Sequence, residues 1–208
     1  MGRPRSADHD LKRRAILDSS GALFARNGYD RTSMAQVAAA CGVSKALLYH
    51  YYTSKDALLF DILRDHLQGL LDVTRAVETS LAPLARLRAL IGALLEAYRD
   101  ADDEHKIQIN EMGKLPEPQR RQLVDMEREL VATFAEAIAA VLPDVGRDKS
   151  LLKPVTMSLF GMLNWHYMWF REQGSMSRDA YADLVTTLLV EGAGSLAGSA
   201  QVRAGRRA

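Results

Sequence analysis

Apolar residues recur every three or four positions along nearly the whole chain, and this spacing restricts the fold more than any other feature of the sequence. Residues three and four apart share one face of a helix, whereas the side chains of a strand alternate at every second residue. The clearest run lies near the C-terminus, at Tyr181, Leu184, Val185, Leu188, Leu189 and Gly192. No stretch of useful length alternates as a strand would. The sequence therefore predicts an all-α fold.

Glycines, prolines and acidic pairs interrupt this periodicity and set the expected helix boundaries. We expect helices at about 11–27, 34–40, 45–51, 54–82, 84–101, 106–114, 118–142, 149–171 and 178–196. Residues 197–208 are small and basic and lack periodicity, so they are expected to form a disordered tail. A chain of 208 residues buries about 70% of its unfolded surface, so it needs no disulfide or metal in order to fold.

The composition argues against several kinds of site. Cys41 is the only cysteine, which rules out an internal disulfide and a four-cysteine zinc site. The histidines lack the spacing of metal ligands, and there is no glycine-rich phosphate loop or nucleophile motif. The acidic segment Asp102-Asp103-Glu104 is better explained as a solvated helix junction than as a metal site. We therefore expect no cofactor and no metal.

No segment has the pattern of a membrane span or an export signal. The longest uncharged stretch, residues 154–170, is shorter than the ~20 apolar residues that cross a bilayer. It predicts a helix buried on nearly every side, in a core, beside a cavity or in a subunit interface. The first ten residues carry two arginines and two aspartates instead of an apolar stretch, unlike a signal peptide. A cytoplasmic protein without a membrane partner is expected.

The charge is divided unevenly along the chain. Residues 1–55 hold 9 Lys and Arg against 4 Asp and Glu, a balance of +5, and the remaining residues hold 18 against 22, a balance of −4. The two balances add to the net charge of +1. A basic N-terminal part on an acidic body favours a polyanionic partner for that part. Chance is the alternative explanation of the difference.

Residues 33–52 have the spacing of a helix-turn-helix, which is two short helices joined by a tight turn. Ser33 and Gln36 form a capping box at the start of the first helix. Gly42 supplies the positive φ that the turn needs, and the small Ala38 lets the two helices cross closely. The expected inward side chains are Val37, Cys41, Val43, Leu48 and Tyr52.

The outward residues of the second helix are the ones that a DNA-binding helix-turn-helix inserts into the major groove. They are Ser44, Lys45, Ala46, Leu47, Tyr49 and His50. An ordinary helical hairpin would show the same spacing. A helix that is merely solvated would not favour Tyr49, His50 and Tyr51 together, so the pattern favours a nucleic-acid contact.

The segment from Thr32 to Leu59, TSMAQVAAACGVSKALLYHYYTSKDALL, resembles the DNA-binding signature of TetR-type (tetracycline-repressor-like) transcriptional regulators. The resemblance includes Phe24 and Asn27-Gly28-Tyr29 of the preceding helix. It implies a three-helix DNA-binding domain at 10–70 and a helical effector-binding and dimerisation domain at 71–196. It also implies a homodimer that binds a near-palindromic double-stranded DNA operator and releases it when a small-molecule effector enters the C-terminal domain.

The resemblance assigns individual DNA contacts. Those expected at phosphates are Thr32 or Ser33, Tyr49, Tyr51 and Lys55. Lys45 would reach a base edge or a phosphate, and His50 would lie close to the DNA. Leu47 stands where a threonine is usual, so a contact there would be apolar, toward a thymine methyl group. Much of the specificity is then expected from Lys45, Ala46 and the shape of the DNA.

Aromatic and methionine side chains gather in the C-terminal part of the chain. The expected effector-binding residues are Tyr98, Met112, Phe134, Phe160 and Trp165. Such a set is core in most proteins, whereas the same helices enclose the effector cavity in the TetR-type family. Residues 164–171 with Tyr181 resemble regulators that sense acyl-CoA thioesters, and residues 44–52 resemble regulators of aromatic-acid breakdown. An acyl-CoA thioester or a related acid is the implied effector.

The last two long helices are expected to form the dimer contact through Leu184, Val185 and Leu188. The long helix that begins at Ser54 is the expected lever between the two domains, with His66 on its inner face. Two other readings stay open. A constitutive or activating DNA-binding protein would need no effector, and a helical enzyme would need converging titratable groups in the second domain, where none is visible.

Overall fold

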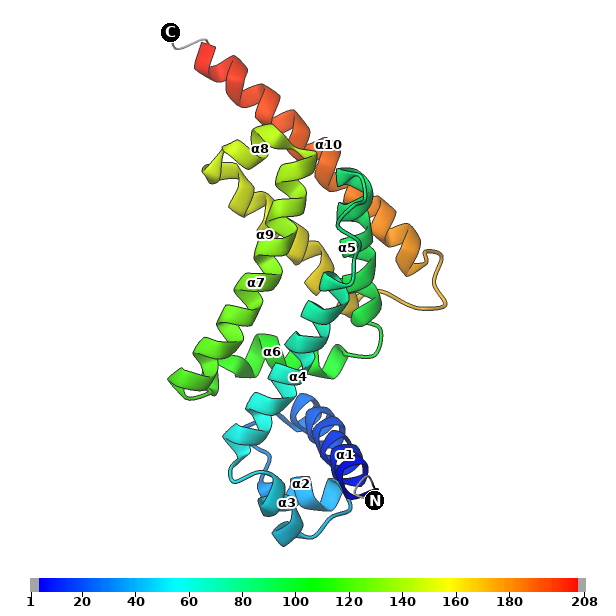
Figure 1. Cartoon of the computed structure of the whole chain (residues 1–208), viewed down its shortest axis with the longest axis vertical. Coiled ribbons are helices and arrows are strands. Elements are labelled where there is room, and N and C mark those ends of the chain that lie inside the picture. The colour runs from blue at the N-terminus through cyan, green and yellow to red at the C-terminus, as the bar shows by residue number, and fades with distance from the viewer. Residues whose placement is uncertain (1–3, 206–208) are drawn as a thin grey trace. The chain divides into compact units, whose positions relative to one another are not determined.

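The computed structural model describes residues 4–205, with side chains described from residue 9 to residue 196 (Figure 1). The helices are α1 (Pro4–Asn27), α2 (Met34–Ala40), α3 (Lys45–Tyr51), α4 (Lys55–Arg75), α5 (Pro83–Ala97), α6 (Asp102–Glu111), α7 (Glu117–Val141), α8 (Pro143–Arg147), α9 (Lys149–Asn164) and α10 (Arg178–Gly205). Two short 3₁₀ helices, η1 (Met112–Lys114) and η2 (His166–Met168), follow α6 and α9. No strand occurs between residues 4 and 205, which confirms the all-α prediction.

The chain forms two compact units. Unit 1 consists of residues 1–68 and 101–125, and unit 2 consists of residues 69–100 and 126–208. The resemblance implied one boundary, between residues 70 and 71, whereas the chain is divided after residues 68, 100 and 125. The return of residues 101–125 to unit 1 was not predicted, and it follows from the packing of α6 against α1.

Unit 1 is built around the apolar face of α1. Ile16 and Phe24 of this helix are each 1% exposed, and Ser20 between them is fully buried with its hydroxyl donating to the carbonyl of Ile16. On the side of α1 that faces α4, Arg13 donates to Asp61 at 2.8 Å and to Asp65 at 3.0 Å. The carboxylates therefore tie α1 to α4 at the edge of the apolar core.

Unit 2 is built around α5 and α10. The residues of α5 that recur at helical spacing, Leu87, Leu90, Ile91, Leu94 and Leu95, are all fully buried. This helix packs against α10, on which Ala182 and Val185 are fully buried, and α8 and α9 also pack against α10. The helical periodicity of α5 thus becomes the inner face of a layered helical unit.

Several helix boundaries differ from those expected. Helix α1 begins at Pro4 instead of residue 11, and the acidic segment expected at a helix junction forms the first turn of α6. The long helix that starts near Ser54 ends at Arg75 instead of continuing to residue 82. Pro143, which was expected to break a helix, begins α8, because proline fits the first turn of a helix. The segment expected as one helix at 149–171 is divided at Trp165 into α9 and η2.

The C-terminal helix also differs from the prediction. It continues through Gly205, so residues 197–205 are helical instead of disordered, and residues 206–208 lie outside the described residues. Alanine, glutamine and arginine favour helix by themselves. Periodicity reports which face is buried, and its absence does not prevent a helix from forming.

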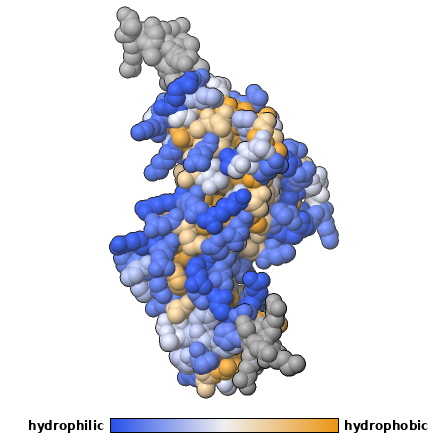
Figure 2. Space-filling model, viewed as in Figure 1, coloured by the Kyte–Doolittle hydropathy of each residue, from blue (hydrophilic) through white to orange (hydrophobic). Residues whose placement is uncertain are grey.

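The stretch 154–170 is not buried on every side as predicted. Met157, Trp165, Met168 and Trp169 are each about half exposed or more. Figure 2 shows hydrophobic patches on a surface of unit 2 that is otherwise largely hydrophilic. Of the alternatives for this stretch, a core position is therefore wrong for these four side chains.

Within residues 4–205, no helix is both long and apolar enough to cross a membrane.

Two glycines allow a direct test of the turn geometry. Gly42 has a φ of +64° and Gly69 lies inside α4, and a Cβ atom added at either position would meet no neighbour within 4 Å. Gly42→Ala should lower the free energy of unfolding by about 1 kcal/mol because alanine resists positive φ. Gly69→Ala should raise it by about 0.5–1 kcal/mol through helix propensity. Urea unfolding followed by circular dichroism measures both, and a neutral Gly42→Ala would contradict the strained turn.

Candidate nucleic-acid interface and effector region

The helix-turn-helix expected at residues 33–52 is formed by α2, a tight turn and α3. Ser33 and Gln36 cap α2 reciprocally: the Ser33 hydroxyl accepts from the Gln36 amide, and the Gln36 side chain accepts from the Ser33 amide at 2.8 Å. In the turn, the Val43 amide donates to the carbonyl of Ala38 at 3.0 Å. The turn therefore closes onto α2 through backbone hydrogen bonds.

The inner side of this motif is close to the predicted one. Val37 and Leu48 are fully buried, and Ala38 and Tyr52 are each 4% exposed. Cys41 and Val43 are half-buried instead of fully inward. Leu48 is the buried anchor of α3, so the rest of this seven-residue helix is free to meet a partner.

The outer side presents the residues that the pattern assigns to DNA. Ser44 caps α3 by accepting from the Leu47 amide at 3.1 Å. The exposed residues at the cap and on the helix are Ser44, Lys45, Ala46, Leu47, Tyr49 and His50. The ammonium of Lys45 lies 5.9 Å from the centre of the Tyr49 ring. Tyr51 is half-buried at the end of the helix. A cation and aromatic rings thus share one accessible face.

Thr32 does not belong to this face. Its side chain is 1% exposed, and its hydroxyl donates to the carbonyl of Gly28 at 2.9 Å. The hydroxyl therefore closes the end of α1 internally. Of the two residues that could touch phosphate before α2, only Ser33 has an exposed side chain.

Lys55 has internal partners that the sequence did not reveal. Its ammonium donates to the carbonyls of Tyr29 and Thr32 at 2.8 Å and 3.0 Å, and it lies 4.1 Å from the centre of the Tyr29 ring. The Tyr29 hydroxyl donates to the carboxylate of Asp56, the next residue of α4. Burial and this carboxylate raise the pKa of Tyr29, so the phenol stays neutral. Lys55 and Asp56 together hold the loop that precedes α2.

The same loop is held from the other side by α6 and η1. Lys114 of η1 forms ion pairs with Asp30 in the loop and, at 2.6 Å, with Glu111 of α6. The Glu111 carboxylate also lies 3.5 Å from the Tyr29 amide. Sequence reasoning assigned residues 106–114 to the effector domain and missed these contacts, because no local pattern relates residue 30 to residue 114.

Two buried histidines lie next to each other in unit 1. His66 of α4 and His105 of α6 have ring centres 6.3 Å apart. Burial and the proximity of His105 lower the pKa of His66 to about 4, so His66 is neutral near pH 7. The two imidazole rings therefore lie next to each other between α4 and α6.

Across the described side chains, no cluster of three or more potential ligands could hold a metal ion.

Three of the five expected effector residues lie inside unit 2. Tyr98 is 7% exposed and donates its hydroxyl hydrogen to Asn164 at 3.0 Å. Burial raises the pKa of Tyr98, so it acts as a neutral donor. Phe134 and Phe160 meet edge to face with ring centres 5.2 Å apart. These side chains form an aromatic and polar part of the unit 2 core.

The other two expected effector residues do not belong to the buried part of unit 2. Trp165 is 55% exposed where the chain leaves α9, and Met112 belongs to η1 of unit 1. Met112 therefore belongs to the other unit, and Trp165 lies at the surface of unit 2 and not in its core. For Trp165 the physical reason is that α9 ends at Asn164, so this residue lies beyond the helix whose inner face the prediction assumed.

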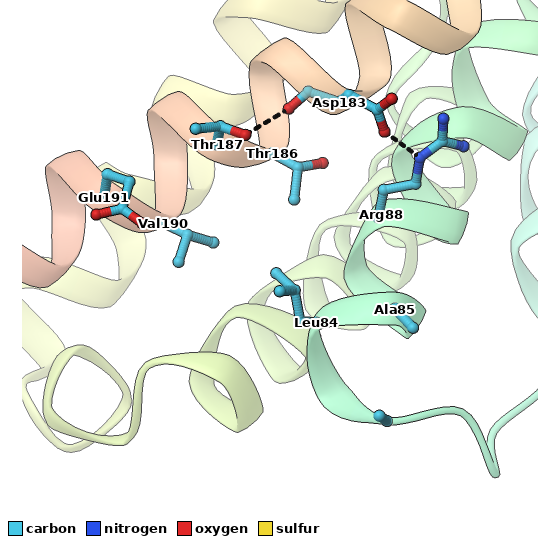
Figure 3. A pocket seen from close by; sticks show the side chains of 9 residues that line it. Leu84, Ala85, Arg88, Asp183, Thr186, Thr187, Val190 and Glu191 are labelled. Carbon is cyan, nitrogen blue, oxygen red and sulfur yellow. Dashed lines mark hydrogen bonds and ion pairs between the residues drawn. The ribbon is translucent and has the colours of Figure 1, made fainter.

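Unit 2 also carries a pocket of about 680 Å³ between α5 and α10 (Figure 3). Its walls are lined by Ala82, Leu84, Ala85, Arg88, Asp183, Thr186, Thr187, Val190 and Glu191. Arg88 donates to Asp183 at 2.7 Å across one end of it. None of the five expected effector residues lines this pocket, and the sequence reasoning did not single it out.

The expected dimer face is only partly as predicted. Leu184 and Leu188 are 40% and 57% exposed on α10, whereas Val185 is fully buried in unit 2. Val185 therefore belongs to the core, because it lies about 100° around the helix from Leu184. The exposed Met157, Trp165, Met168 and Trp169 add apolar surface on α9 and the segment after it, which is the other of the two long helices expected at the dimer contact.

Comparison with protein families identifies both parts of the chain. Residues 16–62 match the family described as "Bacterial regulatory proteins, tetR family". Residues 80–193 match "Tetracyclin repressor-like, C-terminal domain". Together the two matches cover the helix-turn-helix with its flanking helices and most of the following helices.

Relatives and solved structures show the same similarity over most of the chain. A transcriptional repressor named KstR2 from Rhodococcus jostii is 28% identical over 88% of this chain and 92% of its own length. The crystal structure of a TetR-family regulator from Bordetella parapertussis is 38% identical, with a TM-score of 0.80 over 86% of this chain and 93% of that one. The regulator AibR, solved with isovaleryl coenzyme A and operator DNA, is 28% identical, with a TM-score of 0.72 over 86% and 98%.

The two lysines of the interface should differ in their effect on stability. Lys55→Met should lower the free energy of unfolding by about 1–2 kcal/mol, because two buried carbonyls lose a charged donor. Lys45→Met, the matched control, should change it by less than about 0.5 kcal/mol because Lys45 is exposed. Urea unfolding of both variants tests this difference. Equal free energies of unfolding for the two variants would show that the Lys55 hydrogen bonds do not stabilise the fold.

Proposed function

This chain belongs to the tetR family of bacterial transcriptional regulators, and we propose that it is a repressor whose operator is released by a small apolar acid or acyl-CoA thioester. The observation that carries the DNA-binding part is the exposed face of α3, with Lys45, Tyr49 and His50 accessible on a helix anchored by Leu48. Operator binding would place the protein in the bacterial cytoplasm, where the chromosome lies. Its role would be regulatory and not catalytic.

The contacts proposed for DNA follow from the accessible groups. The first turn of α3 would enter the major groove, where Lys45 reaches a base edge or a phosphate and Leu47 meets a thymine methyl group. Tyr49 and Tyr51 would hold phosphates. Lys55 uses two hydrogens of its ammonium on the loop carbonyls, which leaves its third for a phosphate.

Selection of duplexes from a random pool, followed by titration at several salt concentrations, tests DNA binding. Lys45→Ala should weaken binding to the selected duplex and change the base preference. It should also reduce the slope of log affinity against log salt concentration by about one per subunit. Lys153→Ala, on the exposed side of α9, is the control and should leave all three unchanged. Identical base preference and slope for Lys45→Ala and the parent would contradict the proposed recognition surface.

We also propose that the operator is bound by a homodimer, as regulators of this family act. The exposed Leu184 and Leu188 of α10 supply an apolar strip for a two-fold contact, in which the same patch is used by both copies. Two copies would present two α3 helices to successive major grooves.

Replacement of one leucine by glutamate tests this interface. Leu188→Glu should give monomers in sedimentation velocity at micromolar concentration and should lose tight operator binding, because a buried charge would be left unpaired. Leu84→Glu changes a leucine of α5 that is 51% exposed, close to the 57% of Leu188, and it should remain dimeric. A monomeric parent protein would contradict the proposal directly.

The effector is proposed to bind within unit 2, at Tyr98, Phe134 and Phe160. AibR, which was solved with isovaleryl coenzyme A, supports a thioester of this class. The Tyr98 hydroxyl and the Asn164 amide supply polar groups, and the two phenylalanine rings supply an apolar wall. The helix α4 runs from Lys55 in unit 1 to Arg75 in unit 2, and it is the proposed lever between effector and DNA.

Titration of acyl-CoA thioesters into the protein–operator complex tests the switch, with the free acids and coenzyme A as controls. Reversal of a 99:1 population requires about 10⁴-fold tighter effector binding to the released state. Phe160→Leu should shift the releasing concentration at least several-fold, whereas the exposed Trp165→Ala should not. If no compound releases the operator, a constitutive DNA-binding protein becomes the better description. Increased transcription from an operator-bound promoter would indicate an activator.

A further inference from the structure

The short helix α3 depends on contacts beyond its own length. It spans seven residues, and isolated helices shorter than about 12 residues are only marginally stable in water. Its N-terminal end is capped by Ser44, and Leu48 anchors its middle. Its C-terminal end is capped by the buried Tyr52, whereas the side chain of Tyr51 is only half-buried and is held by a contact from another element.

That element is the N-terminal part of α1. The ring of His9 stacks on the ring of Tyr51, with centres 4.7 Å apart and planes inclined by 26°. The ring of His50 meets Tyr51 edge-on, with centres 5.9 Å apart and an angle of 84°. Tyr51 is therefore stacked on one imidazole and lies nearly perpendicular to another. The partner across the face comes from a residue 42 positions earlier in the chain, outside the matched tetR segment 16–62.

The surroundings of His9 favour a stacking role over a direct contact with DNA. Its Nδ1 atom lies 3.6 Å from a carboxylate oxygen of Asp10, and the side chains of the two residues are 52% and 76% exposed. A carboxylate this close would oppose the approach of a phosphate, whereas it leaves the flat face of the imidazole on Tyr51 undisturbed. Aromatic pairs in this arrangement stabilise each other beyond the apolar area that they bury.

We propose that His9 is a positioning residue for operator binding, because its ring holds Tyr51 in the orientation that a phosphate contact requires. The inference rests on the proposed DNA-binding function and extends the reading surface to the first turns of α1. Sequence reasoning placed Tyr51 at a phosphate and gave His9 no role.

The test compares two replacements of His9 in binding to a selected operator, measured by fluorescence anisotropy on the full chain. His9→Ala removes the ring and should weaken binding about fivefold per subunit, or roughly 25-fold for a dimer. His9→Phe keeps a ring and should bind within about twofold of the parent. Leu11→Ala, at a position of α1 that is 70% exposed, is the control and should also stay within twofold. Circular dichroism melting confirms that each variant is folded.

A second background separates a role through Tyr51 from a general role in α1. In the Tyr51→Leu variant, adding His9→Ala should weaken operator binding less than twofold, because the stacked pair of rings is already absent. An equal loss in both backgrounds would overturn the proposal, as would unchanged binding of His9→Ala. If His9→Phe binds the operator as weakly as His9→Ala does, the imidazole acts through its nitrogen atoms and the stacking role is wrong. A parent that selects no duplex would refute the DNA-binding function itself, whereas a binding parent with an unaffected His9→Ala would refute only this inference.

Discussion

The ammonium of Lys55 is the contact on which the geometry of unit 1 depends. The loop between α1 and α2 has no regular structure to satisfy its backbone, and two of its carbonyls accept hydrogen bonds from this one side chain. The Tyr29 ring lies against the same ammonium, and its hydroxyl is bonded to Asp56. Because the first turn of α4 holds the loop, the start of α2 and the tilt of the whole helix-turn-helix are set by residues that follow the motif in sequence.

This contact belongs to a wider pattern in which elements outside the helix-turn-helix position it. Lys114 and Glu111 approach the same loop from α6 and η1, and Arg13 joins α1 to α4 through Asp61 and Asp65. The buried rings of His66 and His105 lie next to each other between α4 and α6. The segment 101–125 is therefore part of the DNA-reading unit, although it follows a helix of the other unit. A movement of α6 would therefore reach the loop before α2 through the side chains of Glu111 and Lys114.

The sequence predicted the fold and the exposed side of α3 because those features depend on local patterns. The capping box at Ser33, the positive φ at Gly42 and the buried Leu48 all agree with the structure. The predictions that failed concerned packing. Thr32 and Trp165 were assigned roles from their residue type and position in a pattern, but one is buried in a loop and the other is exposed where α9 ends. The spacing of apolar residues cannot tell a core from an uncovered face, which is why Val185 and Leu188 were grouped together.

By itself, the sequence determined that the fold is helical, where the chain turns between α2 and α3, and which side of α3 is open, because these follow from backbone preferences and side chains a few residues apart. Only the tertiary structure decided that residues 101–125 join unit 1, that Lys55 turns toward the loop carbonyls, and that His9 reaches Tyr51. Each of these is a contact between residues that are distant in the chain. Such a contact depends on how whole helices pack in three dimensions, and no pattern within a short stretch of sequence encodes that packing.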